Sequence, residues 1–481
     1  MPEYLAPGVY VEEVSFRQKT IEGVSTSTTG FIGPTRFGPL AGEPELITSF
    51  TDFERIYGGI DQLEFEDEPL PMDNHVAHAA RTFFTEGGQR LYIARTYAFP
   101  VETDEDVFGR SVWPDATLSP DPGFVLRARF PGRAGDFTVS MTFRLGENVL
   151  RTEPVDPSDS SPGAPTHQIL RGAQPLDTVW VEAGSPGSAQ LYWVERFFDV
   201  PAGRWTHRLR DDDPANDPAT GPVALDDVTS VRVLTVGVVV SRMGKFGDEQ
   251  SWEGLTFHPD HLQSLSRVFD PQPPNASAYL RVPLTFERLA LTNGADIAGA
   301  LMAQDNVLDG TPVIDHLTDV PPSSDALRTM RKRLEGGSDG DRPGPGEYEG
   351  DDGGASGEKS GLKAFEDVEE ISILAGPGST FGLEGTYTAE AQTITRLLIA
   401  HCELMRYRVA VLDSGDAQTL GNVRNFRAGI DTTRAALYYP WVRVFDPFTE
   451  REIHLPPSGF VSGIYARNDV DRGVQIGRAH V

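Results

Sequence analysis

Apolar positions recur with two different spacings along the chain, and the change from one to the other divides it. Residues 1–99 and 286–475 combine strand-like runs with helical spacing, in which apolar residues return every three or four positions. Residues 100–285 show only strand-like runs between turn signals. The pattern predicts a multi-domain protein in which an α/β core, a mixed sheet with flanking helices, carries an inserted all-β module that is β-sandwich-like.

The first part of the predicted core covers residues 21–99. Its pattern predicts strands at 24–34, 46–48 and 90–95 and helices at 49–57 and 73–86. The first helix places Phe50, Phe53 and Ile56 on one face, and Gly58-Gly59 ends it. Strands and helices alternate here, as is typical of an α/β unit.

The inserted region at 100–285 has no helical period. Its strand-like runs lie at 124–130, 137–143, 178–182, 190–198 and 231–240. We expect this β-rich region to be peripheral to the core and separable from it by a deletion of about residues 101–283.

The second part of the core, at 286–475, begins again with α/β spacing. Its segment at 336–361 is rich in glycine and acidic residues, which predicts a mobile surface loop. A β-α-β unit comes next. It consists of a strand at 371–375, a glycine loop at 376–382, a helix at 389–406 and a strand at 409–412. A further helix at 422–436 and a strand at 436–445 are also predicted.

Residues 1–20 form a separate extended arm in this interpretation. Pro7-Gly8 makes a turn, and the strand-like run Val9-Tyr10-Val11-Glu12 has no hairpin partner beside it in sequence. A terminal strand without a local partner either frays or pairs with something distant, such as another chain.

The charge balance argues against some classes of function. Asp and Glu number 71 against 42 Lys and Arg, a net charge of -29, so direct binding to a nucleic-acid backbone is not expected. The single cysteine, Cys402, excludes an intrachain disulfide and a cysteine-based zinc site. The apolar run at 234–240 is too short to cross a bilayer, and the first residues lack signal-peptide features. We expect cytoplasmic synthesis and no membrane insertion.

The glycine loop is the strongest enzyme-like pattern. Gly376, Gly378 and Gly382 lie between a predicted strand and helix, where a loop can hold a pyrophosphate at the helix N-terminus. The third glycine is one position late for the dinucleotide fingerprint, and Pro377 offers no backbone N–H. An ordinary turn is the favoured interpretation, and a nucleotide-binding α/β enzyme using this loop is the alternative.

Other chemical candidates have equally plain structural explanations. His75 and His78 share one face of a helix without an evident third metal ligand. Four acidic residues lack the spacing of an EF-hand loop: Asp339, Asp341, Asp351 and Asp352. We therefore expect no metal site and no cofactor.

Catalytic groups are not expected either. Cys402 lies between His401 and Glu403, but consecutive helix residues point about 100° apart, so a buried apolar role is favoured. Asp413 and Asp416 follow a strand, where α/β enzymes place catalytic groups, yet no nucleophile or base accompanies them in a known pattern.

Eight stretches, taken in order, carry a resemblance to a known family. They are PGVYVEEV (7–14), TSTTGFIGPTRFGPL (26–40), ITSFTDFERIYGG (47–59), FFTEGGQRLYIAR (83–95), ARFPGRAGDF (128–137), LEGGSDG (334–340), GLKAFEDVEEISILAGPG (361–378) and PPSGFVSGIYARNDVDRGV (456–474). The ordered set resembles the contractile tail sheath family of phage tails and related injection systems. Glu86 stands where that family more usually has Asn, and the middle of the chain, at about 140–285, carries no such motif.

The resemblance implies a structural subunit and not an enzyme. Such a subunit polymerises helically around an inner tube and contracts to drive it, with the α/β core near the tube and the β insertion outside. Its partners would be other copies of itself, the inner tail tube protein, and the baseplate and tail terminator proteins. The arm residues implied to pair with a neighbouring subunit are Pro7, Gly8, Val9, Tyr10, Val11, Glu12, Glu13 and Val14. Assembly would be cytoplasmic, within a virion tail or an injection particle.

The C-terminal end departs from that family. Sheath subunits continue past the ARNDVDRGV-type segment into a helix-containing region and a strand-bearing arm, whereas this chain has seven residues after Val474. Residues 476–481, IGRAHV, are what a common sequencing-adapter string encodes. We expect an assembly artefact there, a truncated C-terminal domain, and impaired sheath formation by the 481-residue chain. A third interpretation, besides the sheath and the enzyme, is a monomeric surface or carbohydrate-binding β protein based on residues 100–285.

Overall fold

The computed structural model describes most of the chain. The described residues are 27–101, 103–113, 122–156, 158, 161, 165–182, 189–200, 203–210, 225–242, 249–318, 324–354, 357–446 and 450–472. The predicted arm residues 7–14 and the adapter-like residues 476–481 lie outside them. Within the described residues the protein is a mixed α/β structure with several sheets, which confirms the predicted α/β character.

A six-stranded sheet joins the two halves of the chain. Its strand order is β18-β17-β16-β1-β3-β2. The strands are β1 (Thr28–Pro34), β2 (Leu46–Ile47), β3 (Arg90–Thr96), β16 (Ile373–Ala375), β17 (Val409–Asp413) and β18 (Ala435–Tyr438). All neighbours pair in parallel except β2, which is antiparallel to β3. Because β1 pairs with both β3 and β16, with Thr29 opposite Ile373, early and late segments form one sheet.

Helices cover both faces of this sheet because successive strand residues point to opposite sides. Phe31 of β1 packs in a cluster with Phe53 and Phe83, and Ile32 packs in another with Leu398 and Cys402. The first face carries α1 (Phe50–Tyr57), α2 (His75–Thr85) and α10 (Ser458–Arg472). The second carries α6 (Pro345–Glu349), α7 (Gly361–Ala364), η5 (Phe365–Asp367) and α8 (Thr388–Met405). This parallel sheet with two covered faces is the α/β body.

Local signals account for the ends of these helices. The Ser49 side chain accepts a hydrogen bond from the Asp52 N–H at the start of α1, and Gly58 ends that helix with φ 85°. The predictions at 49–57, 73–86 and 389–406 are confirmed to within two residues. The predicted helix at 422–436 is too long, because α9 spans Leu420–Ala428 and Ala435 already belongs to β18.

The predicted strand at 436–445 is also corrected. It is divided between β18 and β19 (Val442–Asp446), with Pro440 between them. Proline has no N–H to donate to a strand partner, so a single strand cannot continue through it. β19 then pairs with β20 (Arg451–Leu455) as a hairpin that leads into α10.

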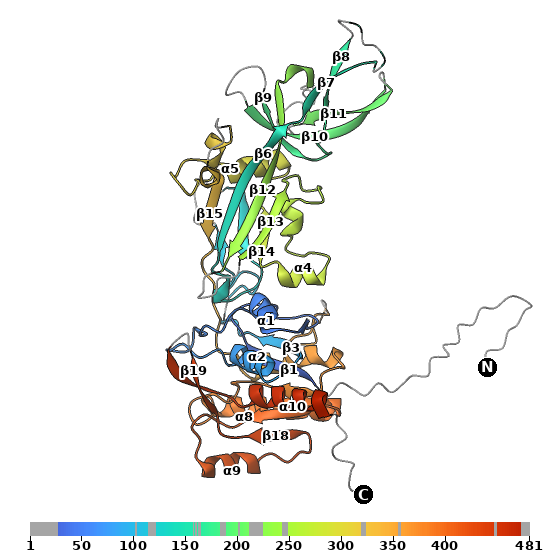
Figure 1. The fold of residues 1–481 in the computed structure, drawn as a ribbon. Helices are drawn as coiled ribbons and strands as arrows, with labels where there is room; N and C mark the ends of the chain where they lie inside the picture. The colour runs from blue at the N-terminus through green and yellow to red at the C-terminus, as the bar shows by residue number, and fades with distance from the viewer. Residues whose placement is uncertain are drawn as a thin grey trace, which may run out of the picture.

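A seven-stranded sheet forms most of the β region, which extends away from the α/β body (Figure 1). Its order is β11-β10-β9-β12-β6-β15, and β13 also pairs with β12. The strands are β6 (Thr138–Asn148), β9 (Thr178–Glu182), β10 (Ala189–Asp199), β11 (Arg204–Arg210), β12 (Ser230–Ser241), β13 (Glu249–Leu255) and β15 (Thr329–Arg333). Because β15 pairs with β6, strands of this sheet continue beyond residue 285, where the predicted region ends.

Smaller sheets complete the region. A three-stranded sheet has the order β14-β5-β4, and β7 and β8 form a hairpin near the far end (Figure 1). These strands are β4 (Val112–Trp113), β5 (Phe124–Ala128), β7 (Leu150–Pro154), β8 (Thr166–Leu170) and β14 (Leu284–Arg288). Phe124 of β5, Phe286 of β14 and Phe143 of β6 share one hydrophobic cluster, so the three-stranded and seven-stranded sheets pack together.

Short helices and turns pack around these sheets. They are η1 (Arg133–Gly135), η2 (Leu225–Asp227), α3 (Leu265–Val268), α4 (Ala276–Arg281), α5 (Gly294–Met302), η3 (Val313–His316) and η4 (Asp325–Arg328). Ile297, Leu301 and Met302 of α5 are fully buried in the same hydrophobic cluster. No helix in the described part of the chain is long and apolar enough to cross a membrane.

The segment at 336–361 contradicts the prediction of a mobile surface loop. Asp339 is 2% exposed, and its carboxylate accepts hydrogen bonds from the N–H groups of Glu64 and Arg133 at 3.0 Å each. Tyr348 in α6 is 3% exposed within the second core cluster of the α/β body. The glycines that indicated mobility instead allow close backbone contacts. Residues 337–345 are buried or half-buried, whereas Asp351, Asp352 and Glu358 are exposed, so it is mainly the later part of the segment that lies at the surface.

Hydrogen bonds to backbone carbonyls connect the α/β body and the β region. The Arg95 guanidinium donates from Nη1 to the Pro131 carbonyl at 2.9 Å, and from Nε to the Thr35 carbonyl at 3.1 Å. Arg242, just after β12, donates from Nη1 to the carbonyls of Glu54 and Arg55 in α1. These hydrogen bonds add to an apolar contact, because Phe37, which follows β1, packs in the hydrophobic cluster of the β region beside Phe130.

Candidate functional site

The glycine loop lies at the carboxyl ends of the parallel strands, the place where α/β enzymes bind ligands. It follows β16, and His75 at the start of α2 lies directly against it. The His75 ring is 5.3 Å from the Phe381 ring and 5.2 Å from the Trp441 ring, between centroids. A Cβ added at Gly378 would lie 2.5 Å from His75 Nδ1. An imidazole therefore occupies the space that a phosphate would need.

The remaining space beside the loop is very small. The cavity bounded by Gly378, His75 and Arg342 measures about 10 Å³, roughly the minimum volume for one water molecule. Arg342 is already engaged, because Nη1 lies 3.1 Å from Glu68 Oε1 and Nη2 donates to the Phe381 carbonyl. Burial lowers the pKa of His75 to about 3, so its ring is neutral at pH 7. The loop is thus filled by packed side chains.

We expect no nucleotide binding at this loop. Calorimetry with ATP or NAD should show no site tighter than about 1 mM, which corresponds to about 4 kcal/mol. The matched variant His75→Ala removes the ring that fills the loop while leaving Gly376, Gly378 and Gly382 in place. Micromolar binding by the unaltered protein, lost on Gly378→Ala, would restore the nucleotide-binding alternative.

Asp413 supports a helix rather than a reaction. Its two carboxylate oxygens accept hydrogen bonds from the N–H and the hydroxyl of Ser458, at 2.8 and 2.7 Å. Ser458 is the first residue of α10, so the carboxyl occupies the N-terminal end of that helix. Burial raises the pKa of Asp413 to about 7, which the two Ser458 hydrogen bonds only partly offset. Asp416 lies farther along and is 2.9 Å from His454 Nδ1.

This burial predicts a pH effect on stability. The pKa of Asp413 is about 7 in the folded protein, against an ordinary value of 3.8. At pH values between these two, the Asp413 carboxyl is protonated in the folded protein and ionised in the unfolded chain. Its contribution to stability should therefore fall as pH rises from about 4 to about 7, by roughly 2–4 kcal/mol. Asp413→Asn should flatten this part of the profile in urea unfolding at several pH values. Asp416→Asn is the control, and equal slopes for Asp413→Asn and the unaltered protein would contradict the assignment.

Cys402 is a buried apolar residue of α8, as its sequence context favours. Burial raises the pKa of its thiol to about 12, so the nucleophilic thiolate is scarce at neutral pH. Its neighbour His401 contacts the Arg408 guanidinium at 2.6 Å, and burial together with that charge lowers the histidine pKa to about 4. A cationic partner beside the imidazole is the opposite of what a thiolate-activating base requires.

The predicted metal-like patterns are not brought together. In the described part of the chain, no three His, Cys, Asp or Glu side chains are placed to share a metal ion. Asp339 is held by backbone N–H groups, whereas Asp351 is exposed and Asp352 lies 3.6 Å from the Lys363 amine. His78 is buried on α2, and burial lowers its pKa. Asp339 and His78 are thus accounted for by packing, and Asp352 by a local ion pair.

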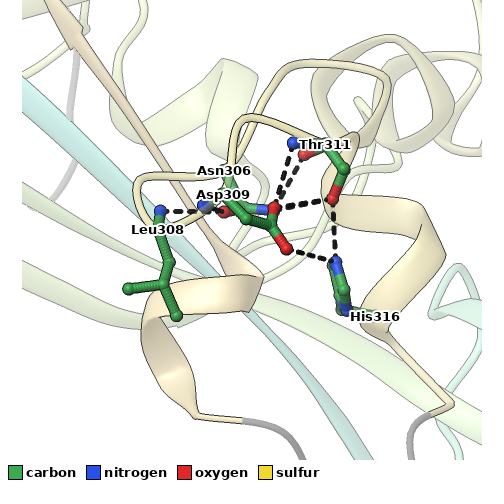
Figure 2. Close-up of polar contacts among 5 residues, drawn as sticks. All are labelled: Asn306, Leu308, Asp309, Thr311 and His316. Atoms are coloured by element: carbon green, nitrogen blue, oxygen red, sulfur yellow. Dashed lines mark hydrogen bonds and ion pairs between the residues drawn. The ribbon is translucent and has the colours of Figure 1, made fainter.

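The sequence analysis missed one cluster with the residue types of a catalytic triad. Figure 2 shows it around a turn of the β region, formed by Asn306, Leu308, Asp309, Thr311 and His316. His316 Nε2 lies 2.8 Å from Thr311 Oγ1, and the same nitrogen lies 3.5 Å from Asp309 Oδ2. In a triad the acid holds the other imidazole nitrogen, which leaves Nε2 free to act on the hydroxyl. This geometry does not provide a general base.

The same cluster has a clear structural role. Asn306 Oδ1 accepts hydrogen bonds from the N–H groups of Leu308 and Asp309, and Asp309 Oδ1 accepts from the Thr311 N–H and hydroxyl (Figure 2). Hydrogen bonds from Asn306, and then from Thr311, lower the pKa of Asp309. The Asn-x-x-Asp-x-Thr spacing is a turn signal that could have identified this loop from the sequence.

The comparisons with known proteins leave the family open. No protein-family model and no curated protein matches this chain. Function therefore rests on its own residues and on the arrangement of the described elements.

Proposed function

We propose that this protein is the structural subunit of a contractile sheath, from a phage tail or a related injection system. In this role it polymerises helically around an inner tube and contracts to drive that tube. It performs no catalysis and needs no cofactor. Its partners are further copies of the same chain, the inner tail tube protein, and the baseplate and tail terminator proteins.

One observation carries the proposal: sequence blocks that resemble the sheath family, although far apart in the chain, meet in one body. The block at 26–40 contains β1, the block at 83–95 contains β3, and the block at 361–378 contains β16. These three strands are direct neighbours in the six-stranded sheet. A chance set of short matches would not be expected to converge on one sheet.

The remaining blocks extend this body. The block at 47–59 forms α1, and the block at 456–474 includes α10, which packs against α2. The blocks at 128–137 and 334–340 meet where the β region begins, since Leu334 N–H donates to the Phe137 carbonyl. The resemblance therefore covers the α/β body and its connection to the β region, but not the far strands.

The position of β1 suits transmission of force. The arm residues 7–14 lie in sequence just before β1, which has a parallel neighbour on each side. Residues 15–27 form a connection that can reach at most about 45 Å. A neighbouring subunit that holds the arm as an added strand would thus be tied to the centre of this sheet. Rotation of subunits could then occur without their separation.

We assign the β region to the outside of the sheath, as a β-sandwich-like module, and the α/β body to the side of the inner tube. Figure 1 supports this division, because the β region projects from one end of the α/β body. Contraction in this scheme is a rigid-body rearrangement from a kinetically trapped extended state to a compact state. The driving free energy comes from differences between interfaces, so the subunit itself requires no nucleotide.

Electron microscopy of the protein expressed from its natural gene tests this proposal. The natural protein should form helical tubes, and deletion of residues 2–14 should abolish tubes while leaving the circular dichroism spectrum of the fold. The matched control replaces Arg17, Gln18 and Lys19 by alanine and should still form tubes. Tubes from the arm-deleted protein would refute strand exchange, whereas failure of the natural protein to assemble with or without its inner tube protein would refute the sheath function.

A further inference from the structure

A cleft of about 720 Å³ separates the α/β body from the β region. Its walls come from residues 39–44, 93–95 and 358–364 on one side and from residues 271–287 on the other. A volume of several hundred cubic ångströms is typical of sites for small molecules. Polar and apolar groups line the cleft in similar measure. It is therefore not simply an apolar gap between the two parts of the fold.

Three arginines line this cleft: Arg95, Arg110 and Arg129. None of them makes an ion pair within 4.0 Å in the part of the chain that the structure describes. Arg95 and Arg129 are 3% and 2% exposed. Asp339 and Asp270 act electrostatically on Arg95 and Arg129 from farther away, so these guanidinium groups lack a direct carboxylate contact but not a nearby negative charge.

Donor groups of these arginines also lack acceptors. Arg95 uses Nε and Nη1 for carbonyl oxygens, but its buried Nη2 has no hydrogen-bond partner among the described residues. The buried Nε of Arg110 is likewise unpaired there. Arg129 donates to four backbone carbonyls, including those of Val282 and Pro271, so its position is fixed. Because Arg95 Nη2 and Arg110 Nε are both buried, a ligand reaches them only if the side chain moves, which the half-buried Arg110 is freer to do than Arg95.

The other charges that line the cleft do not cancel these groups. Lys359 already lies 2.9 Å from Asp367 and 3.4 Å from Glu366, and Glu287 already lies 3.1 Å from Arg127. The remaining lining carboxylates belong to residues that are exposed: Glu43, Asp106 and Glu358. Buried cations thus lie beneath exposed anions, and a ligand must pass the anions to reach the cations.

We propose that this cleft binds a small multivalent anion, one that carries two or more carboxylate or phosphate groups. A planar guanidinium donates two parallel N–H groups to such an oxyanion, and charge-assisted pairs of this type are the strong ones. Arg110 is the contact that can move, since it is only half-buried and no hydrogen bond or ion pair holds its guanidinium within the described part of the chain, while Arg129 supplies fixed positive charge.

The electrostatics of the cleft are consistent with this assignment. Burial lowers the pKa of Arg129 to about 10, Tyr279 and Asp270 partly offset this effect, and the charge of Arg110 adds to it. Burial also lowers the pKa of Arg95 to about 10. A bound anion would reverse both effects by placing negative charge beside the guanidinium groups. The site goes beyond the proposed function and does not depend on it, because anion binding can be measured whether or not the protein assembles.

Binding of citrate, pyrophosphate and inorganic phosphate to the full chain tests the proposal, by calorimetry at low ionic strength. Citrate or pyrophosphate should bind saturably and more tightly than phosphate, because a multivalent anion places more negative charge beside Arg110 and the buried arginines. Arg110→Gln should weaken binding about tenfold or more. Asp106→Asn should strengthen it, because one repelling carboxylate is removed. Arg81→Gln on α2 makes the same charge change away from the cleft and should leave binding unchanged.

The variants distinguish binding of the anion in this cleft from nonspecific attraction of anions to arginines elsewhere on the surface. Equal weakening by Arg110→Gln and Arg81→Gln would overturn the proposal, as would the absence of saturable binding by all three anions. Circular dichroism of each variant establishes that the fold is retained. If Arg110→Gln does not fold, Asp106→Asn still decides the question: unchanged or weaker citrate binding by that variant would contradict the site.

Discussion

Replacement of Arg408 by leucine should lower the free energy of unfolding by about 3–5 kcal/mol. The Arg408 side chain is fully buried in the α/β body. Its Nε donates to the Ile371 carbonyl at 3.0 Å, and its Nη2 donates to the carbonyls of Phe365 and Val368 at 2.8 and 2.6 Å. Leucine has a similar apolar stem but no donors. It would leave the Ile371 carbonyl without a donor and the Phe365 and Val368 carbonyls with only their backbone hydrogen bonds, just before β16.

Chemical denaturation followed by circular dichroism measures this loss. Arg408→Lys keeps the charge but cannot supply the planar fork of donors, so it should give a smaller but clear loss. Arg424→Leu on the exposed helix α9 is the control and should change stability by less than about 0.5 kcal/mol. A loss below about 1 kcal/mol for Arg408→Leu would show that water or rearranged backbone satisfies these carbonyls.

Local patterns in the sequence predicted the helices of the α/β body well, because the signals that end them are local. Phe53 and Ile56 have the spacing of one buried face of α1, and Ser49 and Gly58 provide its ends. The β-α-β order of β16, α8 and β17 is equally local, since β16 and β17 pair in parallel after a single helix. Such elements need little information from the rest of the chain.

Strand partners in the β region could not be predicted in the same way. β6 pairs with both β12 and β15, and Thr142 contacts Thr329 across 187 positions of sequence. A short stretch of sequence does not indicate such a partner, because the alternation of apolar and polar residues along a strand shows only which of its faces is buried. For this reason the predicted end of the β region fell before β15. A deletion at about residues 101–283 would also remove the partner strand of β15, so it is not the clean separation that the sequence indicated.

The chemistry of the candidate sites could not be predicted from the sequence either, but for a different reason. His75 reaches the glycine loop at Gly378 from about 300 positions earlier in the chain, and Ser458 reaches Asp413 from a later helix. Residue composition also misled the interpretation of 336–361, where Asp339 is buried by contacts with Glu64 and Arg133. A motif shows which groups are near in sequence, whereas the chemistry of a site depends on what the fold places against them.

Buried arginines were the least predictable feature. Arginine is normally exposed, so no pattern singled out Arg95, Arg129 or Arg408 as interior residues. Each is held chiefly by backbone carbonyls rather than by a carboxylate. Carbonyl groups have no sequence signature, because every residue carries one. The cleft beside Arg95 and Arg129 was therefore visible only in the structure.

Replacement of Gly132 by alanine should be nearly as destabilising as loss of Arg408, because the backbones of the α/β body and the β region are in close contact there. Gly132 has φ 131°, which L-residues avoid, and an added Cβ would lie 1.9 Å from the Arg36 carbonyl oxygen. Backbone strain of about 1–2 kcal/mol and overpacking of about 1–3 kcal/mol predict a loss of roughly 2–5 kcal/mol. The same carbonyl accepts a hydrogen bond from the Ala134 N–H.

Gly203→Ala is the matched control for this close approach. Gly203 also has a positive φ, 64°, but no atom lies within 4 Å of its added Cβ. It should therefore show only the cost of a left-handed backbone, about 1–2 kcal/mol. The excess loss in Gly132→Ala measures the contact with Arg36 together with the glycine-only backbone conformation at φ 131° and ψ 151°. Equal losses in chemical denaturation would mean that the two parts can move apart without cost. A much larger loss for Gly132→Ala would explain physically why the ARFPGRAGDF stretch has glycine at this position, since any side chain there would push the β region away from the α/β body.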